Sequence, residues 1–278
     1  MRVEITADAA RFLQLVTPAL ERDPLHHTVI ATVVSRLAGA SAGSDSRFRY
    51  ATAHNGNGTV AGFAMYAGPG IYLGTVPGEA VRELARALAE EIPDAGAVEG
   101  AIPDSLAFAE QWTAVSGERA RRSKGSRLYR LGGLRIPEIP GYSRPATESD
   151  IEACTRWNAD MDAESAGALD ESGVRARIAV GALRLWIDGE RPVSMAGHHP
   201  RAFGWSRIGP VYTPPADRGH GYAGAATADL AQRLRASGSQ VCLFTDPANP
   251  TSNKIYRSIG FEAVREYERY EFTDPAAG

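Results

Sequence analysis

Two glycines and an arginine in one short segment have the chemistry of a phosphate-binding turn. Arg218–Ala223 reads Arg-Gly-His-Gly-Tyr-Ala, follows the apolar run Ile208–Val211 and opens a run of helix-forming residues that ends at Arg235. The first turn of a helix has unpartnered backbone N–H groups and the positive end of the helix dipole, so it attracts a phosphate. Gly219 and Gly221 have no side chain to keep a bulky pyrophosphate from the backbone. The segment predicts a site for a phosphorylated cofactor.

Two common phosphate-binding patterns fit this segment poorly. Gly219, Gly221 and Gly224 match the G-x-G-x-x-G pattern of dinucleotide-binding proteins in form, but no acidic residue follows about 20 positions later to bind a ribose. Cys242 and Leu243 stand there instead. A P-loop is excluded because no Lys-Ser or Lys-Thr pair follows the glycines. The pattern that remains is R-x-x-G-x-A.

A second motif, Asn249–Phe261, follows the strand-forming run Val241–Thr245. It reads N-x-x-x-N-x-x-Y-x-x-x-G-F. Its first asparagine is expected to cap a helix that ends at Gly260. Asn253 and Tyr256 are three residues apart and therefore share one face of this helix.

Together, the two motifs resemble those of the GCN5-related N-acetyltransferases, the GNAT family, over about residues 145–272. The resemblance implies that the first motif binds the pyrophosphate of acetyl-CoA, a cosubstrate, and that the acetyl group goes to an amine. It also implies an α/β (α+β) fold in which helices flank a mixed, mostly antiparallel sheet. The implied cofactor-binding residues are Val211, Tyr212, Thr213, Arg218, Gly219, His220, Gly221, Tyr222, Ala223, Gly224, Asn249, Asn253, Tyr256 and Arg257.

Acetyl transfer from a thioester to an amine needs a neutral amine, a stabilised oxyanion and a proton for the departing thiolate. By resemblance, backbone groups near Val211–Thr213 stabilise the oxyanion and Tyr256 protonates the thiolate. A structural role is the alternative for Tyr256, with the ring packed on the sheet and the hydroxyl hydrogen-bonded. Asn249 and Asn253 are expected to touch the pantetheine arm of the cofactor or to cap the helix.

The general base is the least defined part of the predicted site. Many GNAT enzymes carry a glutamate on or beside the cofactor-binding strand, whereas Trp205–Val211 contains no carboxylate. The candidates are an acidic cluster and a histidine pair, a residue type suited to base catalysis: Asp160, Asp162, Glu164, His198 and His199. We assign Glu164 from this set; an acceptor amine that arrives neutral needs no base.

The order of elements around these motifs also follows the GNAT order. Thr147 and Asp150 form a capping-box pattern before the first helix. The later predicted elements are a second helix, a hairpin around Asp188-Gly189, the cofactor strand and a closing hairpin after the two motif helices: Ser172–Val180, Leu183–Ala196, Trp205–Thr213 and Ala263–Phe272.

The N-terminal half repeats this order of elements without the phosphate-binding pattern. A turn at Asn55–Gly58 joins two strand-like runs, and Val76–Ala80 (Val-Pro-Gly-Glu-Ala) stands where R-x-x-G-x-A is expected. There Glu79 would repel a pyrophosphate. We predict a tandem protein with a degenerate GNAT-like domain at 1–135, a linker at 136–145 and an acetyltransferase domain at 146–273. An unrelated α/β cap domain is the alternative for the N-terminal half.

Whole-chain properties fit a soluble enzyme. With 30 basic and 33 acidic residues the net charge is −3, which gives no sign of a nucleic-acid partner. Cys154 and Cys242 are too few for a disulfide framework or a metal site and are expected to be buried. No segment has the length of a membrane span, and Met1–Glu4 does not open a signal peptide. We expect a cytoplasmic monomer or homodimer with no metal, nucleic-acid or membrane partner.

Three functions are compatible with these motifs. The first is an acetyl-CoA-dependent N-acetyltransferase that acts on an amine of a small molecule or a protein. The second is a catalytically silent acyl-CoA-binding module with a regulatory or scaffold role. The third is an acyltransferase that uses another acyl-CoA, because the phosphate-binding motif recognises CoA and not the acyl chain. Tyr256 favours the first, and the missing carboxylate on the cofactor strand keeps the second open.

Overall fold

The computed structural model describes residues 1–39, 47–68, 70–162 and 170–274, which form two compact units. Unit 1 contains Met1–Leu128, Asp246–Ala248 and the chain from Arg265 onward, and unit 2 contains Tyr129–Thr245 and Asn249–Val264. This division differs from the predicted boundaries because the last strand of the chain extends into unit 1 and does not end in the domain predicted at 146–273.

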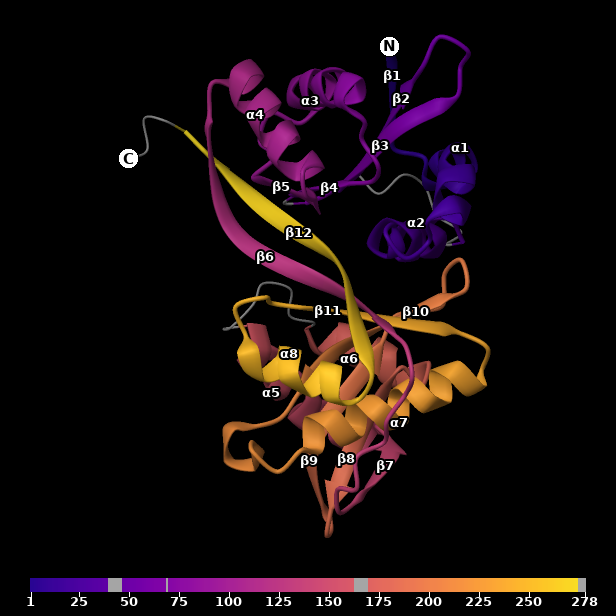
Figure 1. Cartoon of the computed structure of the whole chain (residues 1–278), viewed down its shortest axis with the longest axis vertical. Helices are drawn as coiled ribbons and strands as arrows, with labels where there is room; N and C mark the ends of the chain where they lie inside the picture. Colours follow the sequence, from indigo (N-terminus) through magenta and orange to yellow (C-terminus); the bar gives the residue numbers. More distant parts are fainter. Residues whose placement is uncertain (40–46, 69, 163–169, 275–278) are drawn as a thin grey trace. The chain divides into compact units, whose positions relative to one another are not determined.

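Unit 1 combines helices with a mixed sheet (Figure 1). Its elements are β1 (Arg2–Thr6), α1 (Ala9–Arg22), α2 (Thr28–Ala38), β2 (Phe48–His54), β3 (Val60–Ala67), β4 (Gly70–Leu73), α3 (Gly78–Glu91), β5 (Ala97–Ala101) and α4 (Asp104–Ser116). Strands β1 to β4 pair antiparallel in sequence order, and β4 pairs parallel with β5. The repeat of strands and helices predicted for the N-terminal half is therefore present.

Unit 2 has the order of elements predicted for the C-terminal half. Its elements are β7 (Tyr142–Pro145), η1 (Glu148–Asp150), α5 (Ile151–Asp162), α6 (Glu171–Ala179), β8 (Leu183–Asp188), β9 (Arg191–His198), β10 (Trp205–Tyr212), η2 (Pro215–Asp217), α7 (Tyr222–Ala236), β11 (Gln240–Thr245) and α8 (Pro250–Ser258). Strands β7 to β10 pair antiparallel in sequence order, and β10 pairs parallel with β11. Residues 142–145, which we predicted to be linker, are thus strand β7, paired with β8.

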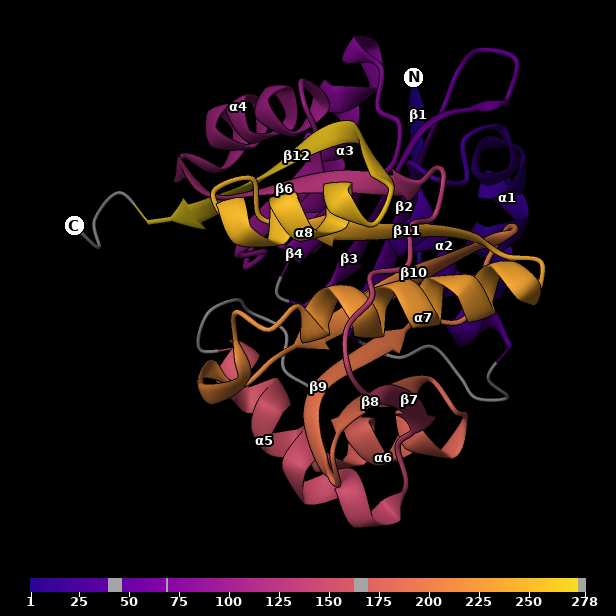
Figure 2. The ribbon, with the colours of Figure 1, turned by 60° about the horizontal axis from the view of Figure 1, so that its bottom comes forward.

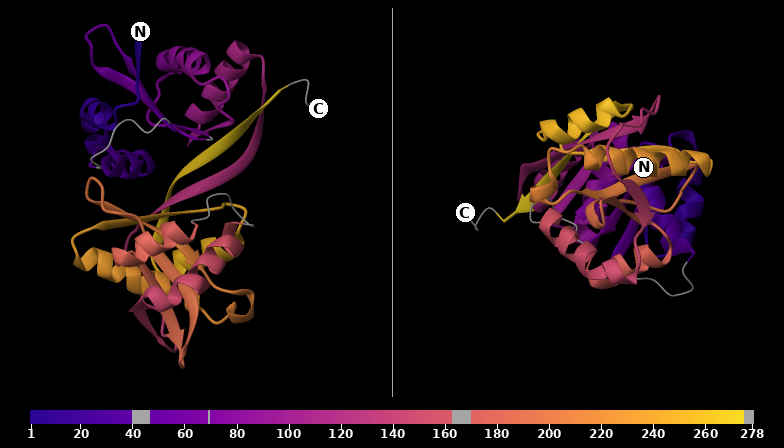
Figure 3. Two further views of the ribbon diagram at one scale, coloured as in Figure 1. Left: turned by 180° about the vertical axis from the view of Figure 1, so that it is seen from behind. Right: turned by 90° about the horizontal axis from the view of Figure 1, so that it is seen from below.

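Helices cover both faces of the sheet in unit 2. Helix α7 packs on one face with a core that includes Ile208, Val193 and Leu243. Helices α5 and α6 cover the other face, where Trp157 and Val174 pack with Met195. Figure 2 shows α7 and α8 side by side, and Figure 3 shows α5 and α6 on the opposite face of the strands. The predicted fold class, helices flanking a mostly antiparallel sheet, is confirmed.

Two long strands differ from the prediction. Strands β6 (Arg119–Leu131) and β12 (Phe261–Thr273) each have 13 residues and run through both units. The closing hairpin predicted at Ala263–Phe272 is therefore wrong: this segment is one strand, and its second half pairs antiparallel with β5. The segment contains no glycine, proline or asparagine for a tight turn, and Phe272 stacks on Trp112 of α4 at 4.8 Å between ring centroids.

Ion pairs also connect β6 and β12, which are neighbours in the sheet. Arginines of β6 form ion pairs with glutamates of β12 along its length: Arg121–Glu271 at 2.9 Å, Arg122–Glu268 at 2.6 Å, Arg127–Glu266 at 2.6 Å and Arg130–Glu262 at 3.1 Å. Cross-strand pairs of opposite charge favour the pairing of β6 with β12. Each exposed pair adds little stability, so their main effect is on the choice of strand partner.

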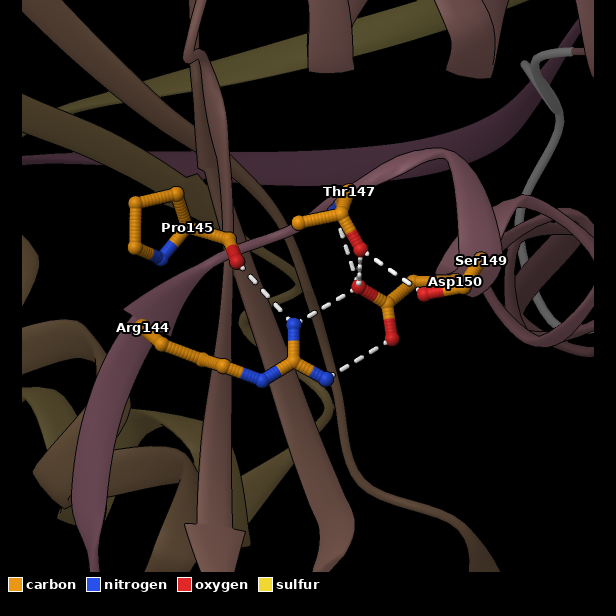
Figure 4. Close-up of polar contacts among 5 residues, drawn as sticks. All are labelled: Arg144, Pro145, Thr147, Ser149 and Asp150. Atoms are coloured by element: carbon orange, nitrogen blue, oxygen red, sulfur yellow. Dashed lines mark hydrogen bonds and ion pairs between the residues drawn. The ribbon is translucent and has the colours of Figure 1, made fainter.

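The predicted capping box at the start of the first helix of unit 2 is confirmed (Figure 4). The Asp150 carboxylate accepts hydrogen bonds from the Thr147 backbone N–H at 2.7 Å and from both terminal nitrogens of Arg144, at 2.7 and 2.8 Å. The Asp150 side chain is 8% exposed. The guanidinium of Arg144 and the Thr147 donors hold the pKa of Asp150 at about 2, although burial alone would raise it.

We expect Asp150→Asn to lower the free energy of unfolding by about 2 kcal/mol at neutral pH, since it breaks a mostly buried ion pair and a helix cap. The folded pKa of Asp150 lies below the value of 3.8 for an unfolded chain. Its contribution is therefore complete above about pH 5 and is lost as the pH falls towards 2. Urea unfolding of both proteins between these pH values tests this prediction.

The matched control is Glu148→Gln, which removes a carboxylate on a side chain that is 82% exposed and pairs with Arg175. This change should alter stability by less than about 0.5 kcal/mol. A stability difference between the parent chain and Asp150→Asn that stays constant down to pH 2 would contradict the assigned role of the carboxylate.

Cys154 and Cys242 form no disulfide and are both buried, as expected from the sequence. Burial raises the pKa of the Cys154 thiol to about 12, so this thiol is not a nucleophile at neutral pH. Among the helices that the structure describes, none has the length and apolar character needed to cross a membrane.

Candidate active site

The glycine turn that the sequence predicts to bind phosphate stands directly before helix α7, as predicted, and follows the short helix η2. Gly219 and Gly221 adopt φ values of +85° and +83°, a conformation that other residues take only with strain. Gly221 is the N-cap of α7, and the first intrahelical bond runs from Ala225 N–H to its carbonyl at 3.1 Å. The amides of the first helical turn therefore have no helical acceptor. No side chain caps the helix and its first turn has no acidic residue, so these donors suit an anion.

Two contacts from the β8–β9 hairpin hold this turn in place. The Arg191 guanidinium donates to both carboxylate oxygens of Asp217, at 2.6 and 3.1 Å, and Asp217 is 5% exposed. The Tyr222 hydroxyl, at the start of α7, hydrogen-bonds to Asp188. The bond from Arg191 lowers the pKa of Asp217, and the bond to Asp188 raises the pKa of Tyr222. These supports were not predicted from the sequence, because only the fold brings residues of the hairpin and of the turn together.

Two predicted residues of the turn, Arg218 and His220, contact backbone carbonyls of the preceding segment. The Arg218 Nε donates to the Thr213 carbonyl at 3.1 Å, and its guanidinium lies 5.8 Å from the Tyr212 ring centroid. The His220 Nδ1 lies 3.2 Å from the Asp217 carbonyl. Arg218 thus links the glycine turn to the end of β10, the segment that the sequence predicts to bind the rest of the cofactor.

The pairing of strands β10 and β11 ends at Ile208, ten residues before Arg218. Their parallel register covers Trp205–Ile208 and Gln240–Leu243. The register of β10 with β9 is irregular between Ile208 and Val211. Beyond Ile208 the β11-facing edge of β10 therefore leaves the ladder, and Val211 to Thr213 lie on this stretch. A strand edge of this kind binds extended ligands through backbone hydrogen bonds.

Helix α8 has the cap that the second motif predicts. The Asn249 side chain accepts a hydrogen bond from Ser252 N–H at 3.0 Å, and Gly260 follows the helix with φ +103°. Asn253 is 5% exposed, and its amide donates to the Asn249 carbonyl at 2.6 Å and accepts from the Tyr129 hydroxyl at 2.8 Å. The polar groups of both asparagines thus serve the protein itself, which favours the capping role over a cofactor contact.

Tyr256 is half-buried on α8 and packs at the edge of the α7 core, with its ring 6.1 Å from the Phe261 ring. Its hydroxyl makes no hydrogen bond within the described chain, so the structural alternative with a satisfied hydroxyl is not what is observed. Burial raises the pKa of Tyr256 to about 12. This phenol therefore keeps its proton at neutral pH, which is the form that a proton donor must have.

Of the remaining predicted residues, some reach β10 and others do not. The Asp160 carboxylate lies 3.4 Å from the Tyr212 hydroxyl. His199 accepts from Arg177 Nη2 at 3.5 Å through Nε2 and donates its backbone N–H to the Arg207 carbonyl at 2.8 Å, whereas His198 bonds to the His199 carbonyl. Arg257 is exposed. Glu164 and the side chain of Asp162 lie outside the described residues.

The corresponding place in unit 1 has different chemistry. Helix α3 has Pro77 as its N-cap and Glu79 in its first turn. The His27 Nε2 accepts the Thr75 N–H at 3.2 Å and lies 3.0 Å from its hydroxyl, and burial lowers the pKa of His27 to about 4. The Phe63 ring covers Gly74 so closely that an added Cβ would lie 2.3 Å from it. Buried side chains thus occupy the strand end that precedes α3.

A surface cavity of about 660 Å³ lies elsewhere in unit 2, between η1, α5 and α6. Its lining includes Glu148, Glu152, Arg156 and Arg175, and none of the predicted site residues. Arg175 is paired there with Glu148 and Glu171, at 2.8 and 3.0 Å. This cavity contains none of the predicted site residues, and we assign it no role in the chemistry.

Comparison with known proteins gives a consistent result for the fold. Residues 187–270 match the family model described as FR47-like protein. A GNAT-family acetyltransferase from Colwellia psychrerythraea is 14% identical, with a TM-score of 0.64, and the match covers 98% of this chain and 100% of that one. A GCN5-related N-acetyltransferase from Sphaerobacter thermophilus is 16% identical, with a TM-score of 0.62 and coverage of 97% and 95%.

A Drosophila protein is 11% identical, with a TM-score of 0.69 and coverage of 98% of both chains. No curated protein sequence matches this chain. At such low identities the likeness to solved structures establishes the fold, and the family-model match adds sequence support in the segment that holds both motifs. The resemblance predicted from those motifs is confirmed: this chain has the fold of the GCN5-related N-acetyltransferases over nearly its whole length.

Proposed function

We propose that this protein is an acetyl-CoA-dependent N-acetyltransferase whose single cofactor site lies in unit 2. The observation that carries the proposal is the start of α7. It has two glycines in left-handed conformation, no side-chain cap and no acidic residue in its first turn, and it follows the separation of β10 from β11.

The residues present fit acetyl-CoA. The amides of Gly219 to Gly224 would bind the pyrophosphate, and space is open around the Cα of Gly219, where no atom lies within 4 Å of an added Cβ. The edge of β10 at Val211 to Thr213 would bind the pantetheine arm. Arg218 and Arg257 supply positive charge near the phosphates, and Arg218 is already oriented by the Thr213 carbonyl.

The proposed reaction is direct transfer. The nitrogen lone pair of the acceptor attacks the thioester carbonyl carbon, and the carbonyl oxygen becomes an oxyanion that backbone N–H groups of β10 near Val211 to Thr213 stabilise. The C–S bond then breaks, the amide is formed, and the CoA thiolate takes the hydroxyl proton of Tyr256. The amine gives up its extra proton to solvent or to a base, for which Glu164, Asp160 and His199 stay candidates.

Unit 1 is proposed to have no cofactor site, in line with the degenerate first domain expected at 1–135. Glu79 places a carboxylate where the pyrophosphate would stand, and His27 already bonds to the backbone of Thr75 at the strand end. Support for this assignment is the contrast with α7, whose first turn has neither feature.

The test is a panel of primary amines with acetyl-CoA and the full chain, in which release of the CoA thiol is followed with a thiol reagent. We expect calorimetry to give one acetyl-CoA per chain and thiol release to depend on at least one amine. Binding without amine-dependent release would support the silent acyl-CoA-binding module instead. Absence of binding would refute both, and faster release from longer acyl-CoAs would assign the third function.

A further inference from the structure

Two arginines meet at the place where β10 leaves its pairing with β11. Arg177, in the last turn of α6, donates from Nη1 to the Gly209 carbonyl at 2.6 Å. Arg207 precedes Gly209 by two residues on β10, and its charge is close enough to lower the pKa of Arg177. Two positive charges thus stand beside the divergence of the strands.

Arg177 differs from the other arginine of the same helix. It is half-buried, makes no ion pair with any described carboxylate, and its polar contacts are the Gly209 carbonyl and His199. Arg175 is exposed and pairs with Glu148 and Glu171. Burial and Arg207 lower the pKa of Arg177 to about 10, so the guanidinium is still charged at neutral pH. A charge that is partly removed from water costs stability unless an anion accompanies it.

The Arg177 guanidinium lies where the acceptor amine is expected to bind. In the proposed function, on which this inference rests, the thioester lies between β10 and β11 beyond Ile208. Arg177 reaches Gly209, the next residue, from α6, whereas the cofactor phosphates lie at α7. A guanidinium has five N–H donors in a planar fork that matches a carboxylate or a phosphate, and the two contacts to the protein leave donors for a ligand.

We propose that Arg177 binds an anionic group of the acceptor, so that the substrates of this enzyme are amines that also carry a carboxylate or a phosphate. The anion is held at the divergence of β10 and β11, which directs the amine towards the thioester carbonyl. Amines with a second positive charge are disfavoured by the charge of Arg177.

The test uses the full chain with CoA present and pairs of amines that differ in the anionic group: alanine and phenylalanine against their amides, and O-phosphoethanolamine against ethanolamine. Binding is followed by thermal shift and turnover with acetyl-CoA by thiol release. The anionic member of at least one pair should bind and react about ten- to a hundredfold better than its neutral partner. The pair that shows this preference tells whether the group is a carboxylate or a phosphate.

Variants of α6 make the test specific. Arg177→Gln should raise the KM for the anionic amine by about tenfold or more, with a much smaller effect on the KM for its neutral partner. Arg177→Lys should restore part of the preference. The matched control, Arg175→Gln, should leave the preference intact. Equal binding of both members of every pair, or a preference that survives Arg177→Gln, would overturn the proposal. So would failure of every amine to bind while CoA binds; failure of CoA itself to bind would refute the proposed function.

Discussion

Replacing Tyr256 with phenylalanine is expected to lower the turnover of acetyl-CoA about 10²- to 10⁴-fold. The affinity of the protein for acetyl-CoA should stay nearly unchanged. The hydroxyl has no partner in the described chain, and burial keeps it protonated to about pH 12. Without it, the CoA thiolate must leave unprotonated or wait for water. Single-turnover thiol release and calorimetry on the same samples separate the two quantities.

The matched control for this variant is Tyr142→Phe, since Tyr142 is 57% exposed on β7 and belongs to the same unit. It should turn over acetyl-CoA at the rate of the parent chain. An unchanged rate in Tyr256→Phe would remove the hydroxyl from the mechanism. A loss of acetyl-CoA affinity equal to the loss of rate would instead make Tyr256 a binding residue.

The second large effect is expected from Ala223→Glu, which gives α7 the acidic first turn that Glu79 gives α3. A carboxylate near the pyrophosphate should weaken acetyl-CoA binding by about 2 kcal/mol, roughly thirtyfold. The helix itself should not suffer, because a negative charge near its N-terminus interacts favourably with the dipole. Calorimetric titration with acetyl-CoA and thermal unfolding without it measure the two effects.

Ala223→Gln is the control, since it adds nearly the same volume without the charge. We expect it to bind acetyl-CoA clearly more tightly than Ala223→Glu, and the gap between the two variants should narrow at high salt. Equal affinities for both variants would show that volume and not charge is sensed at this position, and would contradict an anion site at the start of α7.

Local patterns in the sequence predicted the parts of the site that depend on neighbouring residues. The glycine turn before α7, the Asn249 cap of α8 and the capping box at Thr147 are formed by residues within a few positions of one another. Their backbone requirements are therefore written directly in the residue types. The structure bears out each of these features.

Features that depend on distant residues were not predicted. The path of β12 into unit 1 rests on pairing with β5 and on contacts such as Phe272 with Trp112, 160 positions apart in the chain. One signal was available, because arginines are frequent in 119–130 and glutamates in 262–271, and opposite charges suit neighbouring strands. The bonds from Arg191 to Asp217 and from Tyr129 to Asn253 had no such signal.

The most direct test of a single cofactor site in unit 2 is amide hydrogen exchange of the full chain with and without acetyl-CoA. The expected result is slower exchange at Arg218–Gly224 and Val211–Thr213, with no change at Thr75–Ala80. Slower exchange at Thr75–Ala80, or none at Arg218–Gly224 under saturating acetyl-CoA, would contradict the proposed site.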